Sequence, residues 1–118
     1  MISRYFKDEE LMCKCGCGGM KFNQTTLDKL DAAREFAKVP FVINSGYRCE
    51  AHNKAVGGKE TSSHVKGQAV DIKATNSATR ARVLYGLLMA GFNRLGVDKG
   101  FIHVDDDEAK SPYVTWLY

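Results

Sequence analysis

The sequence predicts one α+β domain over residues 1–118, with helices covering one face of a largely antiparallel sheet. The length of 118 residues suits a single core, and no Pro- or Ser-rich stretch marks a linker between two domains. Hydrophobic residues make up 44% of the chain and charged residues 26%, which excludes intrinsic disorder and a scaffold that depends on disulfides to fold. The third observation is the predicted order of elements: helix, strand, loop, strand, helix and hairpin.

The first helix is expected at residues 26–38. Thr25 and Thr26, with Asp28 close behind them, suit a helix start, and Pro40 lies just beyond the predicted end. Its buried stripe is predicted from apolar residues at helical spacing, which are Leu27, Leu30, Ala33, Phe36 and Ala37.

The middle of the chain predicts two strands with a polar loop between them. Residues 41–43 are apolar and β-branched, and residues 68–74 alternate between apolar and polar side chains, so both segments are expected to be strands. Residues 49–63 are polar and include two adjacent glycines, which favours a loop.

The C-terminal third predicts a helix, a hairpin and an apolar tail. Asn76 or Ser77 suits the helix start. Two short strands at 94–98 and 101–106 flank a two-residue loop, and the tail at 112–118 is expected to pack back onto the sheet. The buried stripe of the helix is predicted to consist of Ala81, Leu84, Tyr85, Leu88 and Met89.

Charge and targeting features narrow the function classes. Seventeen Lys and Arg against fourteen Asp and Glu give a net charge of +3 without a run of like charges, so we expect no nucleic-acid partner, whereas a mildly basic surface suits an anionic polymer such as a cell wall. The N-terminus lacks the apolar stretch of a signal peptide, and nowhere do about 18 apolar residues run together as a membrane span requires. We expect a monomer that is made in the cytoplasm and does not insert into a membrane.

Strand alternation places three metal-ligating residues on one side of the sheet. In residues 69–73 the apolar side chains face one way and Asp71 the other, and in residues 101–105 His103 and Asp105 likewise oppose the apolar face. If the two strands are neighbours, Asp71 and His103 lie close together, and His64 can approach through the turn that follows it. Two imidazoles and one carboxylate suit a catalytic zinc ion, whose fourth position is kept for water. The alternative is that each of the three has only a structural role.

Two gapped motifs carry a resemblance to a known family. They are Ser45-Gly46-Tyr47-Arg48, Asn53, Val56-Gly57-Gly58, Ser63-His64, Gly67, Ala69 and Asp71-Ile72 in the first, and Phe101-Ile102-His103-Val104-Asp105 in the second. Over residues 41–105 the chain resembles the M15 zinc peptidases, and residues 6–17 are similar to small bacteriophage and prophage members. The resemblance implies the hedgehog/DD-peptidase fold, a Zn²⁺ cofactor, and cleavage of bacterial peptidoglycan by a D-alanyl-D-alanine carboxypeptidase or an endopeptidase.

The resemblance also assigns roles to residues. His64, Asp71 and His103 correspond to the metal ligands of the family, in agreement with the face argument. Arg48 corresponds to an arginine near the substrate, where a guanidinium can hold a peptide carboxylate or polarise the scissile carbonyl. Ser45 and Ser63, which belong to the same motifs, are expected beside the substrate.

The proton acceptor is less clearly marked. Well-known members of the family carry an acidic residue three positions before the last histidine, but Gly100 stands there in this chain. Asp98 is the first candidate, since it lies near the place of a hedgehog glutamate, and Asp105 is the second, although it could instead orient a metal ligand. If neither serves, the resemblance supports metal binding without catalysis.

The remaining candidates are weaker. His52 is expected to be a surface-loop histidine, and Ser62 has no His and Asp partners at the spacing of a catalytic triad. Three cysteines lie within five residues and the fourth, Cys49, is distant, and the spacing lacks the C-x-x-C of common zinc knuckles. If residues 13–17 are extended, Cys15 faces away from its two neighbours. One disulfide to Cys49, four free thiols, or a second metal site all remain open.

We therefore predict a zinc metallopeptidase that hydrolyses peptidoglycan stem peptides or cross-links, encoded by a phage or prophage and released to the wall during lysis as an endolysin is. The alternatives are an inactive zinc-containing wall-binding module of the same fold, or a virion structural protein in which the metal only stabilises the fold. The sequence leaves open whether the enzyme is an exopeptidase or an endopeptidase.

Overall fold

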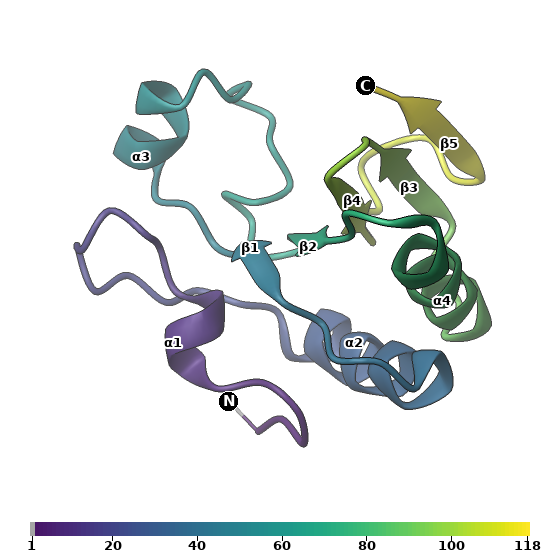
Figure 1. Cartoon of the computed structure of the whole chain (residues 1–118). Helices are drawn as coiled ribbons and strands as arrows, with labels where there is room; N and C mark the ends of the chain where they lie inside the picture. Colours follow the sequence, from purple (N-terminus) through teal and green to yellow (C-terminus); the bar gives the residue numbers. More distant parts are fainter. Residues whose placement is uncertain (1) are drawn as a thin grey trace.

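A computed structural model describes residues 2–118, which form four helices and a five-stranded sheet (Figure 1). The helices are α1 (Asp8–Leu11), α2 (Gln24–Ala37), α3 (Glu50–Ala55) and α4 (Ser77–Met89). The strands are β1 (Ile43–Ser45), β2 (Ala69–Lys73), β3 (Arg94–Val97), β4 (Phe101–Asp105) and β5 (Val114–Leu117).

The sheet is largely antiparallel, as predicted. Its strand order is β1-β2-β4-β3-β5, and the first three neighbouring pairs are antiparallel. The apolar tail forms β5, which pairs parallel to β3 and so confirms that the C-terminus packs back onto the sheet. The predicted hairpin joins β3 to β4, and its loop is closed by a hydrogen bond of 3.0 Å that the Asp98 amide donates to the Phe101 carbonyl.

The two long helices cover one face of the sheet. α2 and α4 pack against each other, and Figure 1 shows both on one side of the strands, with the loops around α3 toward the other. The apolar residues of β2 and β4 join the helices in one buried core, because alternate strand side chains point to the same face. The four that do so are Val70, Ile72, Ile102 and Val104.

The boundaries of α2 differ from the prediction because a different residue caps it. The Asn23 side chain accepts a hydrogen bond of 3.0 Å from the Thr26 amide, so the helix begins before the threonines that the sequence favoured as its start. Lys38, in the left-handed region at φ 57°, ends it. Four members of the predicted stripe are buried, but Phe36 is 40% exposed.

The buried face of α4 agrees with the prediction only at Leu84, which is half-buried against the core. Val83, Gly86 and Leu87 are buried, whereas Tyr85, Leu88 and Met89 are each at least 50% exposed, and the predicted Ala81 is also exposed. The reason is the close approach of α2: a Cβ atom at Gly86 would lie 2.3 Å from the Ala33 carbonyl oxygen. Close packing of backbones therefore selects the small residue for the interface, and the larger apolar side chains lie to one side of it.

Two shorter elements also depart from the prediction. The strand expected at 41–43 is β1 at Ile43–Ser45, because pairing with β2 begins at Ile43 opposite Ile72 and continues, after a shift in register, to Ser45 opposite Asp71. The loop expected at 49–63 contains α3, whose first turn is capped by the Cys49 sulfur accepting from the His52 amide.

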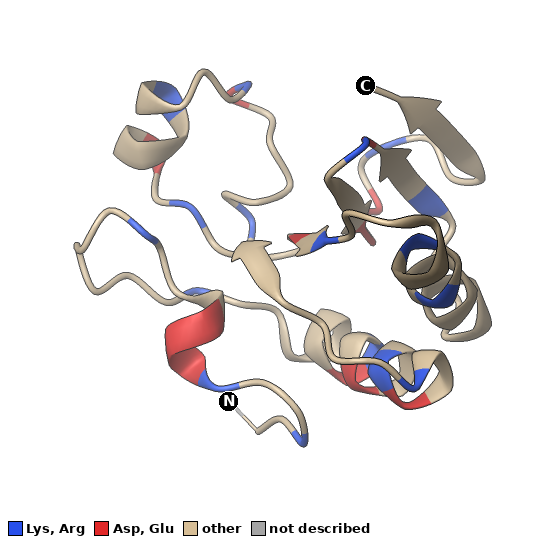
Figure 2. Cartoon of the chain, in the orientation of Figure 1, with Lys and Arg blue, Asp and Glu red and all other residues tan. Residues whose placement is uncertain are grey.

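Among residues 2–118, no helix is long and apolar enough to cross a membrane. Figure 2 shows that Lys and Arg are distributed over several helices, strands and loops, whereas the short helix α1 is acidic.

Candidate functional site

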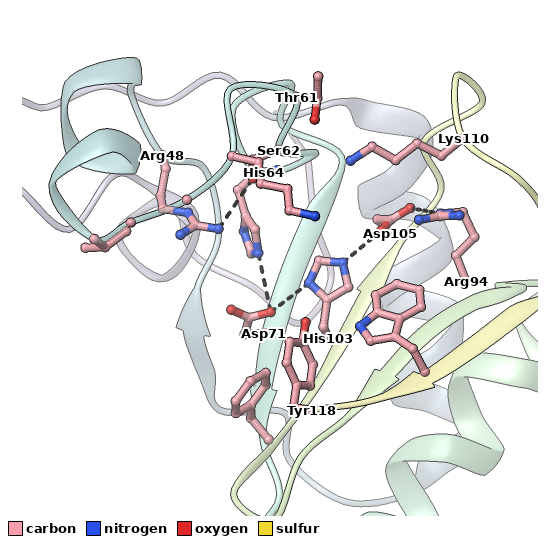
Figure 3. A pocket seen from close by; sticks show the side chains of 16 residues that line it. Arg48, Thr61, Ser62, His64, Asp71, Arg94, His103, Asp105, Lys110 and Tyr118 are labelled. Atoms are coloured by element: carbon pink, nitrogen blue, oxygen red, sulfur yellow. Dashed lines mark hydrogen bonds and ion pairs between the residues drawn. The ribbon is translucent and has the colours of Figure 1, made fainter.

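Register between two central strands brings Asp71 and His103 together. They are direct partners in the β2–β4 ladder, on the face opposite the helices, and Asp71 Oδ1 lies 2.9 Å from His103 Nδ1. His64, from the loop before β2, reaches the same oxygen with its Nε2 at 3.3 Å (Figure 3). One donor atom from each of the three residues lies within 4.8 Å of the others.

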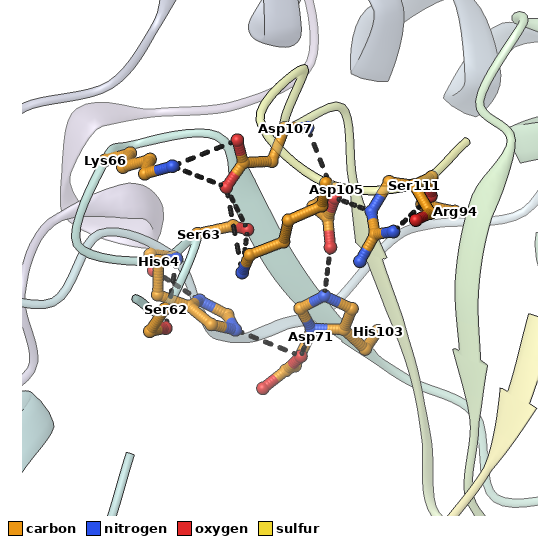
Figure 4. Close-up of polar contacts among 12 residues, drawn as sticks. Ser62, Ser63, His64, Lys66, Asp71, Arg94, His103, Asp105, Asp107 and Ser111 are labelled. Carbon is orange, nitrogen blue, oxygen red and sulfur yellow. Dashed lines mark hydrogen bonds and ion pairs between the residues drawn. The ribbon is translucent and has the colours of Figure 1, made fainter. Parts of the chain in front are cut away.

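The outer nitrogen of each histidine is held by the protein. His64 Nδ1 lies 2.8 Å from the Gly46 carbonyl oxygen, which can only accept, so Nδ1 carries a proton. Nε2 is the atom that faces Asp71: with a proton it donates to the Asp71 carboxylate, and without one it is a free metal ligand. His103 Nε2 lies 2.8 Å from Asp105 Oδ2 (Figure 4). Outer partners of this kind fix the ring orientation of metal-binding histidines. Two imidazoles and a carboxylate that converge in this way fit a zinc ion.

The electrostatics of the cluster keep Asp71 ionised. Burial alone raises the pKa of this carboxyl group, but hydrogen bonds from His103 and His64 outweigh burial and hold the pKa well below its usual range. Burial lowers the pKa of His103, and its bonds to Asp105 and Asp71 more than reverse that effect. The cluster thus offers a carboxylate anion, which is the form that ligates a metal ion.

Asp105 is a buried anchor for His103. Its Oδ1 accepts from Arg94 Nε at 2.7 Å and from the Asp107 amide at 3.2 Å, while Oδ2 binds His103. Both carboxylate oxygens are therefore engaged, and Arg94 supplies the compensating charge. Asp105 fixes the orientation of the imidazole ring.

A second polar network fixes the loop that carries His64. The buried Asp107 accepts from Ser63 Oγ at 2.8 Å and from Lys66 Nζ at 3.0 Å, and Lys110 Nζ in turn donates to Ser63 Oγ at 2.9 Å (Figure 4). These bonds tie the loop on either side of His64 to the segment that follows β4. The position of His64 therefore depends on Asp107 as well as on Gly46.

The histidines and Asp71 lie in a pocket of about 670 Å³ whose rim is basic. Four cationic side chains line it, against the two carboxylates Asp71 and Asp105. The Arg48 guanidinium donates to Ser62 Oγ at 3.4 Å, and its buried Nε has no hydrogen-bond partner. An unpaired buried donor on an arginine is available to an anionic ligand. The four cations are Arg48, Lys59, Arg94 and Lys110.

One wall of the pocket is aromatic. Phe101, Trp116 and Tyr118 line it, and the Trp116 ring centroid lies 5.5 Å from that of His103. Gly96 makes this possible, because β3 places it between His103 and Trp116 in the sheet and a Cβ atom there would lie 2.4 Å from Trp116 Nε1. The absent side chain leaves the room that the indole ring occupies.

Three of the predicted site residues do not line the pocket. Asp98 lies in the β3–β4 turn, where its Oδ2 accepts from the Gly100 amide at 3.0 Å. Ser45 pairs with Asp71 in the sheet without reaching the pocket lining. The Ser63 hydroxyl is buried and engaged by Asp107 and Lys110, so it is not free for a substrate.

Sequence reasoning missed several residues that the structure brings to the site. Arg94 pairs with Asp105 across the β3–β4 hairpin, and the predicted hairpin together with charge complementarity could have suggested this contact. Phe101 shares the face of His103 by simple alternation. Trp116 and Asp107 had no comparable pattern, because their positions depend on the parallel pairing of β5 and on the loop after β4.

A comparison with protein families supplies an independent finding. The family model described as Peptidase M15 matches residues 4–105, which include all three members of the His-Asp-His cluster. No curated protein matches the chain significantly.

Proposed function

Because the chain belongs to the peptidase M15 family, we propose that it is a zinc peptidase that hydrolyses peptide bonds in the stem peptides or cross-links of bacterial peptidoglycan. Family membership indicates a peptidase. The observation that carries the proposal is the convergence of His64, Asp71 and His103 at a pocket with a basic rim.

His64 Nε2, Asp71 Oδ1 and His103 Nδ1 would hold the zinc ion. When bound, zinc polarises a peptide carbonyl and lowers the pKa of water from ~16 toward ~7. The protein contributes a fixed ligand set, since Gly46 and Asp105 hold the outer nitrogens of the two rings in place.

The pocket lining supports an anionic peptide as substrate. Stem peptides carry free carboxylates, and Arg48 can bind such a group in the bidentate geometry that lysine lacks. Lys59 and Lys110 add positive charge to the same rim, while the aromatic wall offers apolar surface to methyl side chains such as that of alanine. Substrate orientation in this proposal depends chiefly on Arg48.

Of the two predicted proton acceptors, Asp105 lines the pocket and Asp98 does not. Both oxygens of Asp105 are already hydrogen-bonded, so we assign it the positioning of His103. The side chain of Asp98 stabilises its own turn. Asp98→Asn is therefore expected to leave peptide hydrolysis unchanged.

This arrangement of carboxylates also favours a second candidate function. Among the pocket-lining residues that the structure describes, Asp71 and Asp105 are the carboxylates, and both belong to the cluster or its support. A zinc-containing module that binds the wall without cleaving it, or a virion protein stabilised by its metal, would need no separate proton acceptor. The two candidate functions differ in that the peptidase releases peptide fragments and the zinc-containing module does not.

We extend the proposal to fold and delivery. A sheet with two helices on one face and a His-Asp-His cluster on the other fits the hedgehog/DD-peptidase fold. The proposed site of action is the cell wall, reached through a membrane opened by another protein during phage lysis. Peptidoglycan is the only macromolecular partner in this proposal, and the protein acts as a monomer.

Digestion of purified peptidoglycan tests the proposal. Zinc-loaded protein is incubated with walls of several chemical types, with and without a chelator, and the soluble fragments are identified by mass spectrometry. Release of a terminal D-alanine would establish a carboxypeptidase, and cleaved stems or cross-links an endopeptidase. His64→Ala serves as the control that should release nothing.

The same experiment separates the second candidate. Sedimentation of the zinc-loaded protein with insoluble walls, without any released fragment, would support the binding module. Thermal unfolding that shifts with the chelator, without wall binding or cleavage, would support a purely structural metal.

A further inference from the structure

A second cluster of metal-ligating side chains lies where the N-terminal segment meets the start of α3. The sulfur atoms of four cysteines lie within 4.8 Å of one another. Cys13 Sγ is 3.4 Å from Cys15 Sγ and 3.6 Å from Cys49 Sγ, and Cys15 Sγ is 3.7 Å from Cys49 Sγ. Cys17 is the fourth member. Two distant parts of the sequence thus deliver one compact set of sulfur donors.

The backbone of residues 13–18 explains how alternate cysteines face the same point. The expectation that Cys15 faces away from its neighbours assumed an extended segment, and it is wrong. The segment turns instead, with Gly16 at φ +86° and Gly18 at φ +77°, a region that residues with a side chain adopt only with strain. A hydrogen bond of 2.9 Å from the Cys13 amide to the Gly19 carbonyl closes the turn.

The sulfur spacing matches a tetrahedral zinc site. With zinc–sulfur bonds of about 2.3 Å, the edges of a tetrahedron are about 3.8 Å long, and the three measured separations are 3.4, 3.6 and 3.7 Å. A disulfide would remove two of the four donors, whereas all four cysteines are free thiols here.

Backbone amides point at three of the four sulfurs. The Cys49 amide donates to Cys13 Sγ at 3.4 Å, the His52 amide to Cys49 Sγ at 3.4 Å, and the Gly19 amide to Cys17 Sγ at 3.3 Å. Such donors stabilise negative charge on sulfur, as the outer partners of a metal site do.

We propose that Cys13, Cys15, Cys17 and Cys49 bind a structural Zn²⁺ ion that is distinct from the ion of the His-Asp-His pocket. Four thiolates close the coordination shell and leave no position for water, so this ion takes no part in hydrolysis. The proposal does not rest on the peptidase activity.

The position of the cluster indicates what the ion stabilises. Cys49 directly follows Arg48, whose guanidinium lines the pocket, and the Tyr47 amide donates to the Leu11 carbonyl at 2.8 Å. The ion therefore fastens the segment from Leu11 to Gly19 against the loop that holds Arg48. Leu11 already anchors the start of this segment in the hydrophobic core, so the part that depends on the ion is the exposed turn that carries Cys15 and Cys17.

Metal analysis of the purified full-length chain tests the proposal. Protein prepared with reductant and excess zinc, then dialysed, is expected to retain about two zinc ions per chain. The variant Cys15→Ser/Cys17→Ser, which changes the two exposed cysteines, should retain about one, and so should His64→Ala. Removing both groups together should leave none.

His52→Ala is the matched control, because this histidine neighbours the cluster through its backbone amide alone and should retain both ions. If the cysteine variant fails to fold, the proposal is tested instead by replacing zinc with cobalt in the wild-type protein. A thiolate-to-cobalt charge-transfer band is expected in both wild type and His64→Ala.

Two results would overturn the proposal. One is a zinc-loaded, reduced wild type that holds a single ion and, after cobalt substitution, shows no thiolate band. The other is an intact mass that reveals a disulfide persisting in the presence of zinc and reductant. The thiolate band reports on the cysteine site, and the zinc lost in His64→Ala reports on the pocket, so a failure of either assignment is recognised without reference to peptidase activity.

Discussion

The two clusters that can hold a metal ion in this protein are built on different parts of the backbone. Asp71 and His103 of the pocket stand opposite each other in a regular antiparallel ladder. The cysteine cluster is assembled from a glycine-containing turn and the first residue before a short helix. Strands fix the direction of a side chain through the pleat, whereas a turn fixes it through φ and ψ values that the residues themselves only partly determine.

This difference is visible in what surrounds each cluster. The pocket donors are buried or half-buried and are supported by the hydrogen-bonded chain from His103 through Asp105 to Arg94. Cys15 and Cys17 are exposed, and the Cys17 sulfur is supported by the Gly19 amide. We infer that the pocket is pre-formed without metal, while the cysteine cluster gains its order from the ion.

The largest expected effect comes from removing a pocket ligand. His64→Ala and His103→Ala should each lose the pocket zinc and all detectable peptide hydrolysis, because two protein ligands do not hold a catalytic zinc ion. Metal analysis and peptidoglycan digestion measure both effects. Cys15→Ser/Cys17→Ser is the comparison: it should lose the other ion but keep the pocket zinc, and it should lose hydrolysis only in part, through a less firmly held Arg48. Stoichiometric pocket zinc in both histidine variants would show that the ligand set is wrong.

Removal of the support for His103 should have the next largest effect. Asp105→Asn is expected to weaken zinc binding roughly 10- to 100-fold, and hydrolysis with it, because the amide no longer offers a carboxylate to His103 Nε2 and Arg94 Nε. Zinc affinity is measured by competition with a chelator. The control Asp98→Asn should change neither value. An Asp105→Asn enzyme with unchanged zinc affinity but no turnover would identify Asp105 as the proton acceptor instead.

The arginine between the two clusters tests substrate binding. Arg48→Lys keeps the charge but loses the planar fork, so kcat/KM should fall roughly 10- to 100-fold through lost charged hydrogen bonds. Lys54→Arg on α3, outside the pocket lining, makes the reverse exchange and is the matched control, which should leave kcat/KM unchanged. Equal kinetics for Arg48→Lys and wild type would remove Arg48 from the substrate site.

Two glycine substitutions compare steric and conformational constraint in the two regions. Gly96→Ala should destabilise the fold by about 1–3 kcal/mol and weaken hydrolysis, because the new methyl group meets Trp116. Gly18→Ala has open space but a positive φ, and should cost about 1–2 kcal/mol through backbone strain alone. Urea unfolding of the zinc-loaded proteins gives both values. Unchanged stability of Gly18→Ala would mean that the turn can relax.

The smallest effect concerns pH and the loop beside His64. Burial raises the pKa of Asp107, but bonds from Lys66 and Ser63 outweigh burial and lower it. The pKa of Asp107 is about 3.9 in the unfolded chain and lower in the folded protein. Ionised Asp107 therefore stabilises the folded state fully above about pH 3.9, and this stabilisation is lost as the pH falls through the pKa of the folded protein. Asp107→Asn should be less stable by roughly 1 kcal/mol at pH 7. The difference in unfolding free energy between the variant and the wild type should become smaller below about pH 4. A difference that stays constant with pH would show that ionised Asp107 does not stabilise the loop.

The sequence was sufficient where regular periodicity decides the structure. The alternation in residues 69–73 and 101–105 predicted that Asp71 and His103 share a face, and the ladder places them as direct partners. It also predicted the sheet type and the packing of the tail against the sheet, although not that the tail forms the parallel strand β5. In these segments neighbouring side chains are related by the pleat, so local pattern carries three-dimensional information.

The periodicity of the sequence did not predict burial correctly where contacts between distant segments determine which side chains are buried. The exposed Tyr85 and Leu88 of α4 looked as suitable for a core as the buried Val83, and only the approach of α2 at Gly86 selects between them. Likewise, nothing in the local pattern around Ser63 indicates that the loop after β4 supplies Asp107 to accept from its hydroxyl. The turn at residues 13–18 could not be predicted from the sequence pattern either, because its glycines permit several backbone conformations.

Anomalous diffraction at the zinc edge, from crystals of the reduced and zinc-loaded protein, tests the central claim most directly. We expect one peak bounded by His64 Nε2, Asp71 Oδ1 and His103 Nδ1, and a second among the four cysteine sulfurs. A crystal with full zinc occupancy elsewhere and no peak at the His-Asp-His cluster would contradict the account of the pocket as a zinc peptidase site.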